Sequence, residues 1–137
     1  MSRTEARECG FKMIYQSFFN NQTNVESFFD SENTQNDVSA TEVLADELQF
    51  ANNIFSNYKE NQKEVEEKLQ NNLKNGLKLT DIYSLDKAIL FATIVQIDYL
   101  HEPLGLAINE AVRIAKKYST DKSSKFVNGV LSSIYKG

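Results

Sequence analysis

The longest apolar stretch of the chain runs from Leu85 to Leu100, with the sequence LDKAILFATIVQIDYL. Its apolar residues fall on nearly every side of a helical wheel, which is typical of a buried central helix or of a membrane span. A span needs about 20 such residues, whereas this stretch is shorter and carries Asp86, Lys87, Gln96 and Asp98. A buried strand would be shorter still. The pattern therefore predicts the central helix of a soluble helical domain.

The apolar positions on both sides of this stretch recur with the spacing of amphipathic helices. They predict six further helices, over about residues 2–20, 23–29, 40–60, 62–73, 103–118 and 122–135. The form S/T-x-x-E at Ser2, Thr23 and Ser39 predicts capping boxes at the first three of these helices. Ser84 is the candidate N-cap of the central helix, and the polar run 30–37 is expected to be a loop. The fold class is therefore all-α, with about seven helices.

Composition agrees with helices, because the chain holds one proline and only five glycines. Its 137 residues predict one domain, spanning 1–137, that buries about two-thirds of its unfolded surface. Asn75-Gly76 is a signal for the end of a helix. Gly129 lies inside the last predicted helix, where glycine costs about 1 kcal/mol relative to alanine. We therefore expect another helix or a ligand to approach Gly129 closely, so that Gly129→Leu would destabilise the fold or block the surface.

Several chemistries are excluded by what the sequence lacks. One cysteine and one histidine exclude a disulfide framework and a Cys/His zinc cluster. The sequence holds no P-loop, no GxGxxG, no HExxH and no GxSxG motif. We therefore expect a protein without catalytic residues, metal or cofactor. The polar residues after Met1 do not form a signal peptide, and a lone cysteine suits a reducing compartment, so the expected location is the cytoplasm.

Charge is unevenly distributed along the chain, although its net value is -4. Acidic residues dominate between residues 24 and 67, and the rest of the chain is net basic. One basic cluster, with Phe126 beside it, comprises Arg113, Lys116, Lys117, Lys122 and Lys125, and a second comprises Arg3, Arg7 and Lys12. Basic side chains near an exposed aromatic suit single-stranded RNA. Ordinary solvated charge, with Phe126 as a core residue, is the alternative.

Three segments carry a resemblance to a known family. The most specific is AINEAVRIAKKYSTDKSSKFVNGVL, from Ala107 to Leu131. The central LDKAILFATIVQIDYL and the N-terminal SRTEARECGFKMIYQ follow the same family pattern in the same order. The chain resembles the NusB family of transcription antitermination factors over nearly its whole length, and the region 20–80 matches least.

The resemblance implies an all-α fold of two small helical subdomains. It implies binding to single-stranded boxA-type RNA together with NusE, a ribosomal small-subunit protein, and an indirect action on the RNA polymerase elongation complex, notably on ribosomal RNA transcripts. The RNA-facing positions carried over from the family are Arg3, Arg7, Lys122, Lys125, Phe126 and Asn128. The positions that would meet NusE are Tyr15, Phe19 and Asp86. We expect the two groups of RNA-facing residues to converge into one basic strip.

The chain departs from the family pattern at three places. Its N-terminal segment has only Arg3 and Arg7 where many members have a longer arginine run. Asn57 stands where the family has a glycine near the end of the third helix, and Phe91 stands where the central motif has arginine. An alternative function is therefore a NusB-like module used mainly for protein interaction or self-association, with little RNA binding alone. A second alternative, an RNA methyltransferase with a NusB-like domain, is disfavoured because the sequence ends at Gly137.

Overall fold

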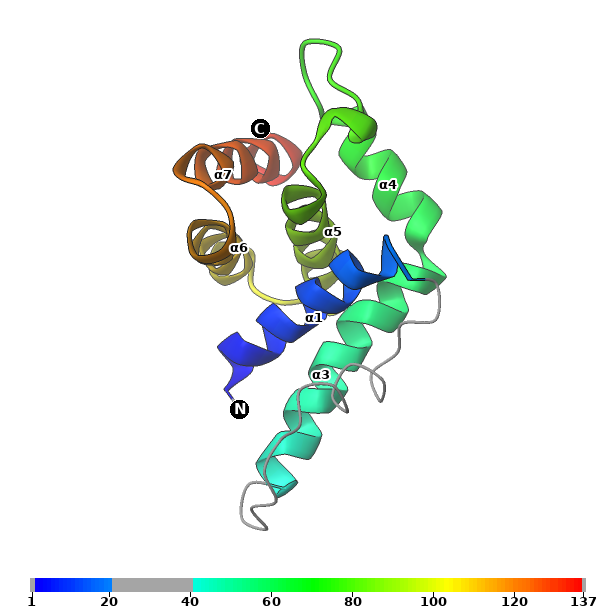
Figure 1. Cartoon of the computed structure of the whole chain (residues 1–137), viewed down its shortest axis with the longest axis vertical. Coiled ribbons are helices and arrows are strands. Elements are labelled where there is room, and N and C mark those ends of the chain that lie inside the picture. The colour runs from blue at the N-terminus through cyan, green and yellow to red at the C-terminus, as the bar shows by residue number, and fades with distance from the viewer. Residues whose placement is uncertain (1, 21–40, 137) are drawn as a thin grey trace.

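The computed structural model of this protein describes residues 2–20 and 41–136, which form six α-helices and one 3₁₀ helix and contain no strand (Figure 1). The α-helices are α1 (Arg3–Ser17), α3 (Thr41–Glu60), α4 (Gln62–Asn71), α5 (Ser84–Asp98), α6 (Leu104–Tyr118) and α7 (Asp121–Tyr135), and the 3₁₀ helix is η1 (Leu79–Asp81). The all-α prediction is confirmed. The helix expected over 23–29, the loop 30–37 and the cap at Ser39 lie outside the described residues.

Helix α5 occupies the centre, as its apolar sequence predicts. It packs against each of the other five α-helices (Figure 1), and Ile89, Leu90 and Ile94 are almost completely buried. The predicted cap is wrong by one residue. Ser84 is the first helical residue, Tyr83 precedes it, and no side chain caps the helix start.

Helices α1 and α3 pack against one another and against α5. The predicted cap of α1 is confirmed, because the backbone N–H of Glu5 donates to Ser2 Oγ at 3.1 Å. The close approach in this pair is made by Gly10, which the sequence analysis did not single out. A Cβ atom at Gly10 would lie 2.8 Å from Cδ1 of the fully buried Ile54. Glycine at this position therefore sets the distance between the two helices.

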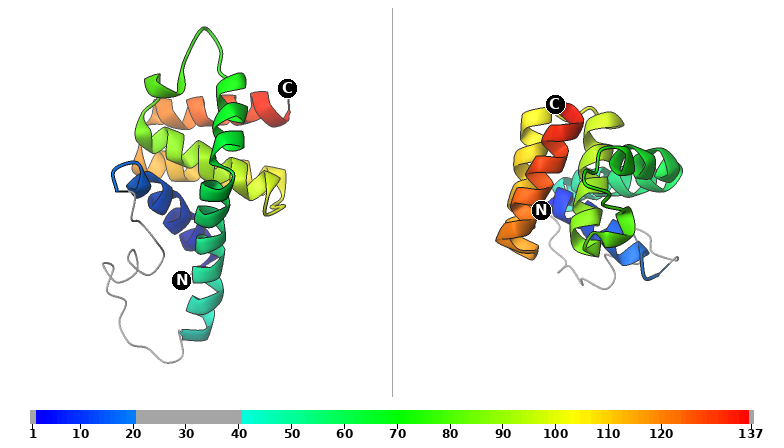
Figure 2. Two further views of the ribbon diagram at one scale, coloured as in Figure 1. Left: turned by 90° about the vertical axis from the view of Figure 1, so that its right-hand side faces the viewer. Right: turned by 90° about the horizontal axis from the view of Figure 1, so that it is seen from above.

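Helices α6 and α7 form a hairpin joined by Ser119 and Thr120 and packed on α5 (Figure 2). The break between the predicted helices 103–118 and 122–135 is confirmed, and Thr120 caps α7. Its Oγ1 accepts a hydrogen bond from the backbone N–H of Ser123 at 3.0 Å. This hairpin carries most of the basic residues of the second half of the chain.

Helix α4 runs into a projecting loop before η1 (Figure 2). The helix end expected at Asn75-Gly76 is displaced, because α4 already ends at Asn71. Asn75 and Gly76 instead form a turn within the loop, where φ is 60° and 74°. In the last turn of α4, Lys68 Nζ lies 2.6 Å from a carboxylate oxygen of Asp98, and the hydroxyl of Tyr135 donates to the same carboxylate at 3.0 Å. These bonds join α4, α5 and α7, and they place the loop over 72–77 beside α7.

Candidate nucleic-acid and protein interface

The two N-terminal arginines lie together, but against acidic partners. Arg7 Nε donates to Gln96 Oε1 at 3.1 Å, and Arg3 Nη2 and Arg7 Nη2 both lie 3.5 Å from Glu102 Oε1. The side chain of Arg7 is only 4% exposed, whereas that of Arg3 is 52% exposed and covers the ring of Phe50. Ordinary solvated charge, the alternative considered for the basic clusters, therefore does not describe Arg7. Its contact with RNA stays a prediction.

Glu8 extends this network to α6. Its carboxylate accepts hydrogen bonds from Arg113 at 2.9 Å, from Lys117 at 3.1 Å and from the Tyr118 hydroxyl at 2.9 Å. Burial by itself raises the pKa of Glu8, but the three donors outweigh it and hold the pKa below its ordinary value. Glu8 was not among the residues predicted from the sequence. The available signal was its position, since Glu8 stands on the apolar stripe of Phe11 and Tyr15, where a charge needs partners.

The acidic network neutralises part of the basic cluster on α6. Arg113 bonds to Glu8 and also to Glu110 at 3.2 Å, and these bonds raise its pKa against the opposing effect of burial. Lys116 remains exposed. It lines a hollow of 420 Å³ between α6 and α7 with Asn109, Val112, Arg113 and Asn128. The predicted RNA contact Asn128 therefore faces the basic side of α6.

At the start of α7, Lys122 and Lys125 are exposed and form no ion pair with any residue that the structure describes. Phe126 packs against the edge of the core and is half-buried. It also lines two hollows, one beside Tyr83 and Lys122 and the other beside the 72–77 loop. Phe126 is therefore both a core residue and a candidate for RNA contact, because one side of its ring packs on the core and the other faces the two hollows.

The single basic strip expected from the sequence is not formed by direct contact. Arg3 and Arg7 contact Glu102 and Glu110, whereas the hollow lined by Lys122 contains neither arginine. In Figure 1, helix α6 lies between the start of α1 and α7. A ligand that touched both groups would therefore have to cross α6 at its basic residues.

The predicted partner residues Tyr15 and Phe19 do come together, with their ring centroids 5.2 Å apart. They line a hollow of 460 Å³ with Tyr83, Ser84, Leu85, Tyr118, Ser119 and Thr120. Phe19 is 70% exposed and Tyr83 is 73% exposed. Tyr83 was missed by the sequence analysis, and its signal was an aromatic residue directly before the central helix. Large exposed aromatics around a hollow are typical of a protein-binding surface.

Asp86, the third predicted partner residue, is buried and already bonded. It lies in the first turn of α5, as expected, and accepts hydrogen bonds from Ser119 Oγ at 3.0 Å and Ser123 Oγ at 2.9 Å. It lines the hollow next to that of Tyr15, and the two hollows share Tyr83 and Thr120. Its carboxylate therefore fixes the α6–α7 turn on α5, beneath the surface that a partner would touch.

The expectation of a close helix contact at Gly129 is wrong. A Cβ atom at Gly129 would have no neighbour within 4 Å, and the residue is exposed on α7. A larger side chain would therefore not strain the fold, although it would enter the hollow beside the 72–77 loop.

Among the described residues, none of the helices is long and apolar enough to span a membrane. Within 2–20 and 41–136, no three His, Cys, Asp or Glu side chains come together in a way that could hold a metal ion.

Comparison with known proteins gives one consistent result. The model of the NusB family matches residues 4–136. The transcription antitermination protein NusB of Macrococcus caseolyticus is 35% identical over 99% of this chain and 98% of its own length. Among solved structures, T. maritima NusB has a TM-score of 0.81 and 25% identity, covering 99% of this chain and 92% of that one. A chain from the complex of antitermination factors NusB and NusE with dsRNA has a TM-score of 0.80 and 23% identity, covering 98% of this chain and 96% of that one. With the family model matched almost from end to end, the chain belongs to the NusB family.

Proposed function

We propose that this protein is a transcription antitermination factor. It binds boxA-type RNA together with NusE and acts through them on elongating RNA polymerase, notably on ribosomal RNA transcripts. Support comes from the relatives, which are named transcription antitermination proteins, and from the related NusB–NusE complex with RNA. The protein works by binding, without catalysis or cofactor, in the cytoplasm.

One observation links this proposal to particular residues. The aromatic hollow of Tyr15, Phe19 and Tyr83 adjoins the hollow of Lys122 and Phe126, because Tyr83 and Thr120 line both. A protein partner on the aromatic hollow would therefore lie beside RNA on the start of α7. Such a neighbour can add its own contacts to the RNA, so that the complex binds more tightly than either protein alone.

A second candidate function is a protein-interaction module that binds little RNA without its partner. The pairing of Arg3 and Arg7 with Glu102 supports it. A carboxylate that already holds these guanidinium groups competes with phosphate for them, so that fewer unpaired cations, among them the α7 lysines, would remain for RNA.

RNA titrations at several salt concentrations test the proposal, with fluorescently labelled boxA RNA, a scrambled RNA of equal length, and protein with and without the NusE of the same organism. The proposal expects tighter binding of boxA RNA in the presence of NusE, and affinity that falls as salt rises. Complex formation with NusE but no RNA binding at any salt concentration would favour the second candidate. Equal affinity for boxA and scrambled RNA would contradict sequence recognition.

The Lys122→Ala/Lys125→Ala double variant tests the proposed RNA surface. Each lost phosphate contact should reduce the slope of log K against log salt by about 0.7 on the single-strand rule. The fold should be unaffected, because both side chains are exposed. Lys63→Ala, on the exposed face of α4, is the matched control.

A further inference from the structure

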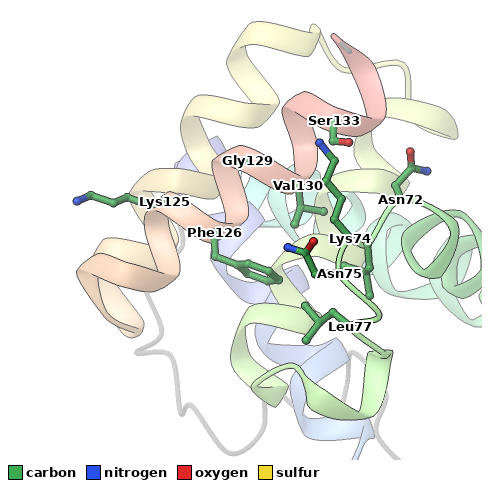
Figure 3. A pocket seen from close by; sticks show the side chains of 10 residues that line it. Asn72, Lys74, Asn75, Leu77, Lys125, Phe126, Gly129, Val130 and Ser133 are labelled. Carbon is green, nitrogen blue, oxygen red and sulfur yellow. The ribbon is translucent and has the colours of Figure 1, made fainter.

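The hollow beside α7 has walls from two segments far apart in the sequence (Figure 3). It has a volume of 320 Å³, and its lining residues are Asn72, Leu73, Lys74, Asn75 and Leu77 from the loop and Lys125, Phe126, Gly129, Val130 and Ser133 from α7. In Figure 3 the ring of Phe126 points from α7 toward the loop that carries Asn75 and Leu77. We propose that this hollow binds one nucleotide of single-stranded RNA, with its base against Phe126 and its phosphates near Lys74 and Lys125. The proposal rests on the RNA-binding function proposed above.

The walls have the chemistry that a nucleobase needs. Phe126, Leu77 and Val130 offer apolar surface for the flat faces of the base, and unpaired bases stack on aromatic side chains. The side-chain amide of Asn75 and the hydroxyl of Ser133 lie at the rim (Figure 3). An amide and a hydroxyl can each donate and accept a hydrogen bond, as the polar edges of a base require.

The charge beside the hollow favours an anionic ligand. In Figure 3 the side chain of Lys74 runs along the hollow, whereas that of Lys125 extends outward from α7. Lys74 and Lys125 are exposed, and neither forms an ion pair with a described residue. This distinguishes them from Arg3, Arg113 and Lys117, which acidic side chains already hold. A purely apolar protein segment would not use two unpaired lysines, whereas RNA phosphates would.

Gly129 leaves the α7 side of the hollow open. Glycine inside a helix is less favourable than alanine, and no neighbour within 4 Å requires it here. The missing side chain therefore has no packing role among the described residues, but it allows a ligand to approach the helix backbone between Phe126 and Val130.

Size and continuity favour a nucleotide over a folded partner. The volume lies at the low end of the range for small-molecule sites, about 300–1,000 Å³. Phe126 belongs both to this hollow and to the one lined by Lys122. An RNA strand on the start of α7 would therefore reach the hollow by continuing past Phe126.

Gly129→Leu tests the proposal, because it fills the hollow without a clash in the fold. Gly105→Leu is the matched control, since a Cβ atom there also has no neighbour within 4 Å and Gly105 lies away from the hollow, in the first turn of α6. With NusE present, we expect Gly129→Leu to weaken binding of the boxA RNA by about 5- to 150-fold, which corresponds to the loss of one stacked base. Gly105→Leu should bind like the wild type, and both variants should keep the wild-type affinity for NusE.

A crosslinking measurement on the unmodified protein makes the test independent of variant folding. RNA in which single uridines are replaced in turn by 4-thiouridine should crosslink, at one position, to peptides containing residues 72–77 or Phe126. Wild-type affinity of Gly129→Leu, or crosslinks that avoid both peptides, would overturn the nucleotide site while leaving the proposed RNA-binding function intact. Loss of NusE binding instead of RNA binding would assign the hollow to protein. Absence of any RNA binding by the wild-type complex would overturn both proposals.

Discussion

Glu8→Gln is expected to destabilise the protein strongly, because it removes the charge at the centre of the α1–α6 network. The carboxylate is almost completely buried and holds three donors, Arg113, Lys117 and Tyr118. Removing one partner of a buried ion pair costs about 3–5 kcal/mol. Since the side chains of Arg113 and Lys117 are 37% and 53% exposed, water compensates part of this loss. The expected cost is about 2–3 kcal/mol.

Thermal unfolding followed by circular dichroism measures this cost. For a chain of this size, about 1 kcal/mol shifts the Tm by about 4 °C, so the Tm of Glu8→Gln should fall by about 8–12 °C at neutral pH. Glu67→Gln is the matched control, because Glu67 is exposed on α4. The same substitution there should change the Tm by no more than about 2 °C.

The pH dependence provides the decisive check on the mechanism. The pKa of Glu8 is lowered in the folded protein from an ordinary value of 4.5. Its contribution is therefore fully present above pH 4.5 and is lost as the pH falls through the lower folded pKa. The difference in stability between wild type and Glu8→Gln should shrink in that acidic range. A constant difference, or a Tm at neutral pH equal to that of Glu67→Gln, would refute the assigned role of Glu8.

Three further predictions follow from packing and exposure. Gly10→Val should lower the free energy of unfolding by about 1–3 kcal/mol, because its side chain would meet Ile54. In a protein that already carries Ile54→Ala, Gly10→Val should cost less, and urea unfolding measures both costs. Equal costs of Gly10→Val in the two backgrounds would contradict this. Asp86→Ala should lower the free energy of unfolding by about 1.5–3 kcal/mol in the same assay, since the hydroxyls of Ser119 and Ser123 lose their acceptor. An unchanged urea midpoint would show that the α6–α7 turn does not depend on these two hydrogen bonds. Phe19→Ala should leave the Tm unchanged but weaken NusE binding in calorimetry, since the ring is largely exposed. Tyr15→Ala should lower the Tm and the affinity for NusE. Wild-type affinity of Phe19→Ala would show that the partner surface lies elsewhere.

The expected effect of Asp86→Lys changes once the structure is known. If Asp86 only faced NusE, as the family resemblance implies, a charge reversal there would repel a basic partner with little effect on the fold. The carboxylate is buried between Ser119 and Ser123, so a lysine there would place an unpaired cation inside the protein. Weaker NusE binding by this variant would then report a damaged fold, and Phe19→Ala is the cleaner probe of the interface.

Local features of the sequence determined the helices and their order. The apolar run of α5 predicted the central helix, because a segment that is apolar all round must be covered on all sides. Ser2 and the turn at Ser119–Asp121 were recognisable from capping chemistry, which involves residues only a few positions apart. The aromatic pair Tyr15 and Phe19 could also be named, because residues four apart meet on one helix face.

Only the tertiary structure decided which of the charged residues face solvent. Arg7 and Glu8 are neighbours in the sequence, and both are buried because Gln96 of α5, Glu102 of the segment before α6 and Arg113 of α6 meet them. Burial of a charge depends on partners that are about 90 to 105 residues away in the chain, and no local pattern contains that information. The same holds for the glycines: Gly10 meets Ile54 of another helix, whereas Gly129 meets nothing within 4 Å. The need for a small residue is set by the distance between elements, which exists only after the chain has folded.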